Sequence, residues 1–490
     1  TGCSDDDSNP EPNPSNPSET PTGPVDEHAW SDSKSRPSKL SFEPVKKNTQ
    51  NFFSVPEGYQ LKVLYAVGDP INPAYEEKKD AELPSGASYQ FRAGDNHDGM
   101  SFFGMDPIAK KYAAKESKQG LLVLNHEYLQ QSQLHTPMGV ITNPDGTRPE
   151  DQVLREVNAH GVSVIEITKD DATQEVKINL NSEFNRRITA ATEMDIRGPA
   201  QGSDMVKTKF SPDGLRTRGT FANCGNGYTP WGTYLTAEEN WSGYFSRQAN
   251  DVREIAKEEV SLSRYGRGGM GARSSQYKWD TPLAELTGQI DLYERWDISI
   301  KAENALQDFR NSLNTCGFIV EIDPFDNRQR PVKRTALGRF AHEDCRSSNP
   351  IPGQPLAFYM GDDATGEYIY KFVSEALWDP KDVNGGYAAG DKYMNKGTLY
   401  VAKFNDDGSG EWLELTHGKN GLDASNTTYP FSGQDDVVIN ARLAADHVGA
   451  TKMDRPEWVA VNPANGEIYV TLTNNGSRGR SYPTDAANPR

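Results

Sequence analysis

The chain has 490 residues, of which 35% are hydrophobic and 10% aromatic, enough to bury a sizeable core. Its formal net charge is −18, from 52 basic and 70 acidic residues, and this acidic balance argues against nucleic acid or an anionic membrane surface as the main partner. No apolar run reaches the roughly 18 residues that a membrane-spanning helix needs.

The first 40 residues predict a polar tether. Thr-Gly-Cys at the start is similar to the end of a bacterial lipobox, whose cysteine is lipidated, so Cys3 is a candidate lipid anchor. Residues 4–23 are Asp, Ser, Asn, Pro, Glu, Thr and Gly, with no apolar side chain to bury, and we expect them to be disordered. This layout predicts an exported protein, periplasmic or at the cell surface. The alternative is that Cys3 stands there by chance.

From residue 41 onward the sequence favours short strands. Runs of β-branched and aromatic residues alternate with turns rich in Asp, Asn, Gly and Pro. Asn250 to Val260 is a candidate helix, with Asn250 or Asp251 as its N-cap. We therefore expect residues 41–490 to form one all-β domain with few helices.

A loose repeat suggests how these strands are arranged. Several segments share an apolar strand, an acidic or Asn turn and often a second strand: residues 120–128, 161–171, 231–240, 316–327, 356–374, 397–415 and 458–475. Hairpin units repeated about every 40 residues are typical of propeller blades. We expect a β-propeller with long insertions, whose C-terminal closure is incomplete in this chain. The alternative is a pair of β-sandwiches.

Polar groups stand at the boundaries of five of the predicted strands, and each group holds at least one carboxylate. They are Asn125, His126 and Glu127 after LLVL; Glu238 and Glu239 at the end of TYLTAEE; His342, Glu343 and Asp344 after GRFA; Asp362 and Asp363 after AFYMG; and Arg455 and Glu457 beside WVAV.

Neighbouring side chains of a strand face opposite ways, so one residue of each adjacent pair is expected to face inward. Carboxylates from several blades would crowd together at one end of the propeller axis, and hard cations such as Ca²⁺ would turn that repulsion into a binding site. Any single group could equally be an exposed turn. The number of such groups favours a metal site.

Two further residues refine this hypothesis. The thiolate of Cys224, in NCGNGY, is a soft ligand that suits iron or zinc better than calcium, although a small buried cysteine is the alternative. Arg455 lies two residues from Glu457, and its forked guanidinium suits a phosphate or carboxylate substrate. A structural pair of Arg455 with Glu457 is the alternative there.

Several stretches together resemble the PhoX-type alkaline phosphatases, which are calcium-dependent phosphomonoesterases exported by bacteria. They are NHEY (125–128), NCGNGYTPWGTYLTAEENW (223–241), EIDPFDN (321–327), RTALGRFAHE (334–343), YMGDDATGEYIYKFVS (359–374) and MDRPEWVAVNPANGEIYVTLTNN (453–475). They run in order from about residue 95 to the C-terminus.

The resemblance implies a propeller of six blades with an iron–calcium cluster at its axis, acting on small phosphate esters. It implies Cys224, Glu343 and Glu457 as iron-side ligands and Arg455 as the phosphate contact. Further metal ligands are expected from a wider pool of Glu127, Glu238, Glu239, Asp362, Asp363 and Asn125. Asn223 and Asp98 are weaker candidates.

Other functions stay open at this point. One is a calcium-dependent lactonase or phosphotriesterase on the same scaffold, which would not need Cys224 as a ligand. Another is a non-catalytic surface propeller with structural calcium. Cys316 and Cys345 fall outside the family pattern, and a disulfide between them is an option in an oxidising compartment.

Overall fold

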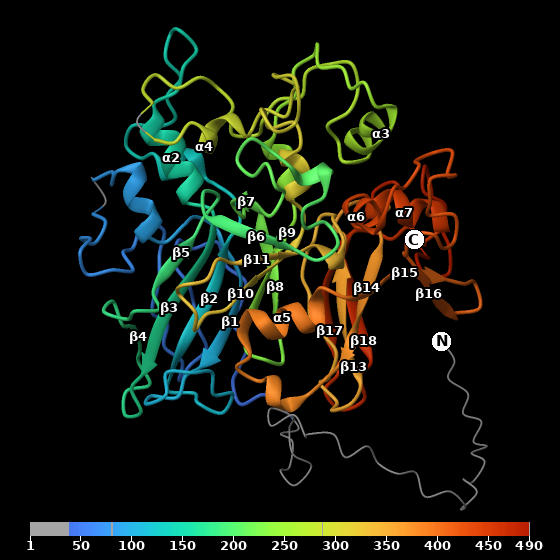
Figure 1. The fold of residues 1–490 in the computed structure, drawn as a ribbon. Coiled ribbons are helices and arrows are strands. Elements are labelled where there is room, and N and C mark those ends of the chain that lie inside the picture. The colour runs from blue at the N-terminus through green and yellow to red at the C-terminus, as the bar shows by residue number, and fades with distance from the viewer. Residues whose placement is uncertain (1–38, 80–81, 287, 490) are drawn as a thin grey trace, which may run out of the picture.

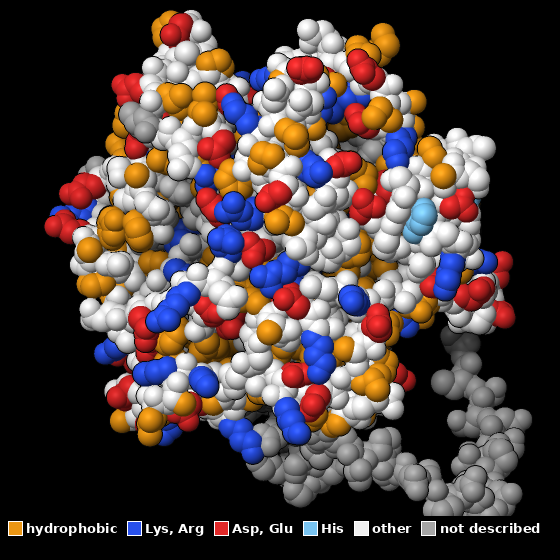
Figure 2. Space-filling view, viewed as in Figure 1, with side chains coloured by type: hydrophobic (Ala, Val, Ile, Leu, Met, Phe, Trp, Pro, Cys, Tyr) orange, Lys and Arg blue, Asp and Glu red, His pale blue; other side chains and the backbone are white. Residues whose placement is uncertain are grey.

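The computed structural model describes residues 39–79, 82–286 and 288–489. Cys3 and almost all of the predicted tether lie outside this range. The described part is mostly β with short helices, as predicted (Figure 1). None of its helices combines the length and apolar character needed to cross a membrane. On the face shown in Figure 2, Lys and Arg side chains are interspersed with Asp and Glu.

Apolar runs near the N-terminus form the first sheet. Its path runs β1 (His97–Gly104), β2 (Gln119–His126), β3 (Gly161–Lys169) and β4 (Val176–Ile178), and β5 (Arg186–Ile188) also pairs with β3. All of these pairings are antiparallel. Phe103, Leu121 and Val164 on one face of this sheet pack against Tyr234 and Val320 of the next sheet. Burial of these apolar side chains holds the two sheets together.

The second sheet has the order β7 (Arg216–Arg218), β6 (Glu193–Arg197), β11 (Val332–Arg334), β10 (Ile319–Ile322), β9 (Tyr234–Glu238) and β8 (Asn223–Tyr228). Only β11 and β6 pair in parallel within it. The third sheet has the order β12 (Arg346–Ser347), β13 (Pro355–Gly361), β14 (Ile369–Leu377), β15 (Gly397–Phe404) and β16 (Gly410–Glu414). The fourth is the hairpin of β17 (Pro456–Val461) and β18 (Ile468–Leu472).

The helical elements decorate the sheets. They are η1 (Gly86–Phe91), α1 (Gln131–Leu134), α2 (Glu150–Asn158), η2 (Asp204–Val206), η3 (Trp241–Tyr244), α3 (Ala256–Arg264), α4 (Asp291–Glu294), η4 (Ser312–Thr315), η5 (Thr335–Leu337), η6 (Pro380–Asp382), α5 (Gly386–Met394), α6 (Gln434–Ile439) and α7 (Ala441–Val448). The predicted start of the helix at Asn250 was wrong. The Asp251 carboxylate accepts from Arg247 and Arg253 instead of capping a helix, and α3 begins only at Ala256.

Four edge strands meet in series where the sheets approach one another. Strand β1 lies against β8, β8 against β12, and β12 against β17. The two glycines of NCGNGY permit this contact. A Cβ on Gly225 would lie 2.1 Å from the carbonyl oxygen of Glu343, and one on Gly227 would lie 1.6 Å from that of Cys345. Only glycine lets β8 approach the backbone of residues 343–345 so closely.

None of the four sheets in the described part of the chain closes on itself. The expected β-rich class with few helices is confirmed. Cys316 and Cys345 are both buried and free, in different core clusters, so they form no disulfide.

Candidate metal centre

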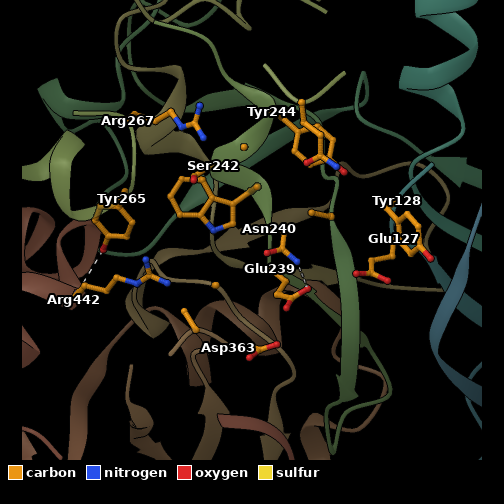
Figure 3. A pocket seen from close by; sticks show the side chains of 16 residues that line it. Glu127, Tyr128, Glu239, Asn240, Ser242, Tyr244, Tyr265, Arg267, Asp363 and Arg442 are labelled. Carbon is orange, nitrogen blue, oxygen red and sulfur yellow. Dashed lines mark hydrogen bonds between the residues drawn. The ribbon is translucent and has the colours of Figure 1, made fainter. Parts of the chain in front are cut away.

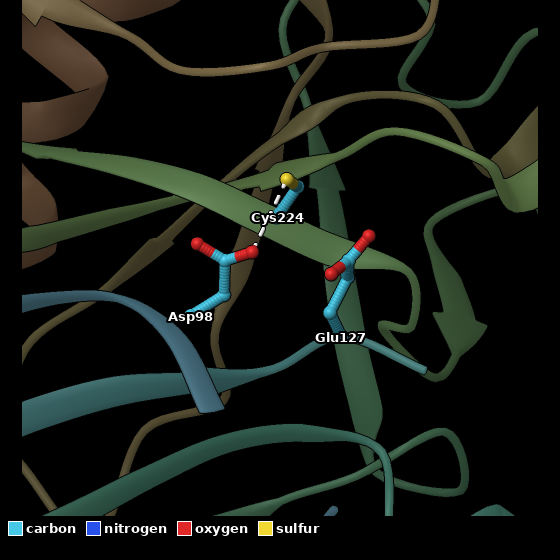
Figure 4. Close-up of side chains that lie close together, drawn as sticks. All are labelled: Asp98, Glu127 and Cys224. Carbon is cyan, nitrogen blue, oxygen red and sulfur yellow. Dashed lines mark hydrogen bonds between the residues drawn. The ribbon is translucent and has the colours of Figure 1, made fainter. Parts of the chain in front are cut away.

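One thiol and four carboxylates come together where these edge strands meet. Asp98 lies on β1, Glu127 follows β2, Cys224 lies on β8, Glu239 follows β9 and Glu343 precedes β12. They form two groups that share the thiol, one of Asp98, Glu127 and Cys224, the other of Cys224, Glu239 and Glu343. Within each group the possible ligand atoms lie within 4.8 Å of one another. Figure 4 shows the first group, with side chains from three strand segments turned toward one another.

The thiol sits at the centre of this acidic cluster, which we define as Asp98, Glu127, Cys224, Glu239 and Glu343. Cys224 Sγ lies 3.4 Å from Asp98 Oδ2 and 3.3 Å from Glu343 Oε1, and its single S–H can donate to either carboxylate. Glu343 Oε2 is buried and has no hydrogen-bond donor. A buried carboxylate oxygen without a donor is costly, so this atom needs a partner that protein side chains do not provide.

Backbone hydrogen bonds to segments outside the cluster fix the main chain at three of its four acidic residues. The N–H of Glu127 donates to Asn96 O at 3.0 Å, that of Glu239 to Ala222 O at 2.9 Å, and that of Glu343 to Gly361 O at 3.1 Å. These bonds do not depend on the charge of the side chains. The main chain at these three residues is therefore held in place whether or not the carboxylates are ionised.

The loop that carries the thiol is fixed in the same way. The amide of Asn125 donates to Cys224 O at 2.7 Å and to Gly225 O at 2.9 Å, and its oxygen accepts from Tyr234 and Thr236. All of its hydrogen-bonding groups serve the scaffold. The structure thus places Asn125 beneath the thiol, where it binds the backbone that carries Cys224, and its role as a ligand stays a prediction.

A second acidic pair borders the cluster. Asp363 accepts from Arg455 Nε at 2.9 Å and from Nη2 at 2.8 Å, and Glu457 lies 3.6 Å from the same Nη2. Asp363 and Glu239 lie close enough to be hydrogen-bonded. The guanidinium of Arg455 therefore stands beside the cluster, held by one carboxylate and near another. Its side chain is 35% exposed, which leaves it reachable from solvent.

In the acidic pairs 238–239 and 362–363, the second residue lies in or beside the cluster, and the first is bound by basic side chains of the surrounding protein. Glu238 points away from its neighbour Glu239 and lies 2.8 Å from the buried Lys333 Nζ, while also accepting from Thr220 and two backbone N–H groups. Asp362 is bound by the Nε and Nη2 of Arg442 at 2.8 and 2.7 Å. Their oxygens are occupied, so the proposed ligand set leaves out Glu238 and Asp362.

The other polar residues of these strand ends have partners in the scaffold. His126 contacts Ser163 at 2.6 Å, His342 contacts Gly338 O at 2.8 Å, and Asp344 accepts from Val459 N. Asn223 donates to Thr220 and Thr236. Asp98 is the exception. The sequence made it only a weaker candidate ligand, and the structure places its carboxylate 3.4 Å from the thiol. A register shift in β1 between His97 and Met100 accompanies that orientation, and bulges of this kind re-aim side chains.

Burial and the neighbouring negative charges raise the pKa values of the acidic groups in the cluster. Burial, with the charges of Glu343 and Asp363, raises the pKa of Glu239 to about 10. Burial and Asp98 raise the pKa of Glu127 to about 8, and burial raises that of Glu343 to about 7. Burial and the neighbouring carboxylates also raise the pKa of the Cys224 thiol. Bound cations would reverse this balance, because they favour the charged forms.

Two strained backbone positions flank the cluster. Ala222, which precedes Asn223 and Cys224, has φ +54°, and Arg455 has φ +60°. Side chains other than glycine rarely adopt this region, at a cost of roughly 1–3 kcal/mol each, and such strain concentrates at functional sites.

A pocket of about 460 Å³ opens beside the cluster. Glu127, Glu239 and Asp363 line one side of it, and Trp241, Tyr244 and Tyr265 contribute aromatic walls (Figure 3). A volume of this order holds a small organic molecule. The pocket therefore offers room for more than an inorganic ion.

The chain matches a known protein family and a solved structure of a related protein. The sequence model of the family described as alkaline phosphatase PhoX matches residues 40–490. A solved structure described as Pseudomonas fluorescens PhoX in complex with vanadate, a transition state analogue, is 37% identical, with a TM-score of 0.76. The match covers 92% of this chain and 71% of that chain. No curated protein matches the chain.

The raised pKa values predict how the metal-free protein responds to pH. Glu127, Glu239 and Glu343 hold protons more tightly when folded than the ordinary carboxyl value of 4.5 allows, so unfolding releases protons between about pH 4.5 and pH 8. Stability must then fall as pH rises through that window. We expect the Tm of chelator-treated protein to be lower at pH 8 than at pH 5. Added Ca²⁺ should raise the Tm more at pH 8 than at pH 5. The Glu127→Gln variant should show a smaller fall. A chelated Tm that rises across this window, or a fall unchanged in the variant, would contradict this prediction.

The division of Glu238 and Glu239 predicts opposite effects of the same substitution. Glu239→Gln should lower the metal content measured by mass spectrometry and leave the chelated protein at least as stable at pH 8. Glu238→Gln should instead destabilise the fold by about 3 kcal/mol or more, because it leaves the buried Lys333 without its carboxylate. Urea unfolding of both chelated variants measures this. Equal metal loss in the two variants would contradict the assignment.

Proposed function

This chain belongs to the alkaline phosphatase PhoX family and is a phosphoric monoester hydrolase, and we propose that its reaction takes place at the acidic cluster around Cys224. The observation that carries this proposal is the half-buried thiol between two carboxylates, with a pocket beside it. Four carboxylates gathered around one half-buried thiol demand compensating positive charge, which fits the metal dependence of PhoX enzymes.

The donor set fits two kinds of cation. Glu343 Oε2 lacks a protein donor, and the carboxylates offer the hard oxygen ligands that Ca²⁺ takes. The sulfur of Cys224 is a softer ligand and suits Fe³⁺ better. We propose Cys224, Glu239 and Glu343 as one ligand group and Asp98 and Glu127 as its extension, with Glu457 at the margin. Both oxygens of Asp363 accept from Arg455, so Asp363 is proposed to orient that arginine. Calcium and iron are the cations proposed.

The bound cations would neutralise phosphate charge and stabilise the charge that builds up during transfer. Arg455 binds and orients the phosphate. Its αL backbone and the bonds from Nε and Nη2 to Asp363 hold the guanidinium beside the cluster, and its other edge, formed by Nη1 and Nη2, would meet the phosphate. The pocket receives the alcohol part of the ester, and its aromatic walls exclude water from one side.

The arrangement of sheets supports a propeller as the architecture of residues 41–490. Strands β1, β8, β12 and β17 are the inner edges of successive sheets and contact one another in turn, as inner strands around an axis would. Each of the four sheets supplies at least one residue of the proposed site. Six blades, decorated by long insertions, are our proposal for the full ring.

The cellular setting is proposed from the sequence. Cys3 and the polar residues 4–23 support an exported enzyme, periplasmic or on the cell surface, with a lipid anchor at Cys3 and residues 1–40 as its tether. Small phosphate esters are its proposed substrates.

Removing the guanidinium should separate phosphate binding from metal binding. Arg455→Ala is expected to lower kcat/KM for p-nitrophenyl phosphate at alkaline pH by about 100-fold, in the range found for a lost transition-state donor. Metal content should stay at the wild-type level, and Arg455→Lys should recover only part of the rate, because lysine cannot form the fork. Arg480→Ala, which removes an exposed arginine of the same region, is the control. Unchanged turnover of Arg455→Ala would remove it from the site.

A further inference from the structure

Arg267 is a cation of the pocket with no carboxylate assigned to it. Its Nη1 donates to two backbone carbonyls, Phe245 O at 3.0 Å and Ser274 O at 3.2 Å, and its Nε is buried with no hydrogen-bond acceptor. Among the described residues, no Asp or Glu forms an ion pair with it. Arg442, which lines the same pocket, is by contrast bound at two nitrogens by Asp362.

The C-terminal end of helix α3 positions Arg267 at the pocket. Helix α3 ends in a Schellman motif, with Gly266 in the left-handed conformation at φ +77°. The N–H of Gly266 donates to Ser263 O at 3.1 Å, and the N–H of Arg267 donates back to Leu262 O at 2.7 Å. This turn sends the arginine side chain toward the pocket, where Figure 3 shows the guanidinium above Ser242 and pointing toward Tyr244.

The pocket therefore has two electrically distinct ends. The carboxylates Glu127, Glu239 and Asp363 lie at one end, where cations and the reacting phosphate belong, and Arg267 lies across the pocket from Asp363 (Figure 3). Burial and the neighbouring Arg273 lower the pKa of Arg267. A negative group beside Arg267 would relieve that cost, whereas the same group near the carboxylates would be repelled.

We propose that Arg267 determines specificity by binding a second anionic group on the alcohol part of the substrate. This inference rests on the proposed function, since it assumes that the reacting phosphate lies at the acidic cluster. It assigns the pocket a substrate class, namely phosphate monoesters whose alcohol carries a carboxylate or a further phosphate. A pocket of about 460 Å³ has room for such an alcohol next to the phosphate.

A matched pair of competitors tests this inference. Sorbitol 6-phosphate and 6-phosphogluconate are open chains with the same phosphorylated hydroxyl, and only the second has a carboxylate at the far end. We expect 6-phosphogluconate to inhibit p-nitrophenyl phosphate hydrolysis with a Ki about tenfold lower, as one charge-assisted hydrogen bond allows. In Arg267→Gln the two Ki values should become equal. Their ratio is internal to each variant, so it does not depend on how far the variant changes turnover.

Two further variants keep the test decisive. Arg273→Gln removes the same charge from the neighbouring arginine, which does not line the pocket, and should retain the tenfold ratio. Gln276→Glu serves if Arg267→Gln does not fold, because it changes an exposed position of the pocket wall and leaves the interior intact. Its new carboxylate should repel the carboxylate of 6-phosphogluconate, so that the tenfold difference between the two Ki values disappears.

The outcomes separate this inference from the proposed function. Wild-type protein that turns over p-nitrophenyl phosphate but binds both competitors equally would overturn the role of Arg267 alone. A preference that persists in Arg267→Gln would also overturn it, since the carboxylate would then be binding to the cations. Absence of p-nitrophenyl phosphate turnover in folded, metal-loaded protein would instead overturn the proposed function.

Discussion

Repulsion among crowded carboxylates is the constraint on which the rest of this structure depends. Glu239 and Glu343 are buried, Asp98 and Glu127 are half-buried, and all four surround one thiol, where burial and mutual repulsion disfavour their ionisation. Side-chain contacts alone would not hold such a group together without cations. The backbone does so instead, through N–H groups that donate to carbonyls of neighbouring segments. The site is thus preorganised by bonds that do not titrate.

This arrangement explains features that core packing would not require. The glycines of NCGNGY let β8 approach the backbone of residues 343–345, so that Cys224 and Glu343 meet although they are far apart in the chain. The left-handed backbone at Ala222 and Arg455 is sustained because the surrounding sheets over-determine it. Since ligands come from several sheets, cations at the cluster would also tie those sheets to one another.

The sequence predicted the β-rich class, the carboxylates at strand ends and the place of Cys224. Alternation along a strand also predicted that one of each acidic pair would face inward, but not which one. That choice depends on basic side chains that lie far away in the sequence: Lys333 binds Glu238, and Arg442 binds Asp362. Asp98 was only a weaker candidate, because its approach to the thiol becomes visible only once β1 is placed in its sheet. Asp251 looked like a helix cap, because its arginine partners are a tertiary feature.

The most direct test of the account is an anomalous diffraction experiment on crystals of protein that hydrolyses p-nitrophenyl phosphate. Difference maps recorded on both sides of the iron absorption edge would locate iron, and longer wavelengths would locate calcium. We expect an iron peak at bonding distance from Cys224 Sγ and Glu343, with calcium among the remaining carboxylates. Active crystals with no metal peak at Cys224 would contradict it.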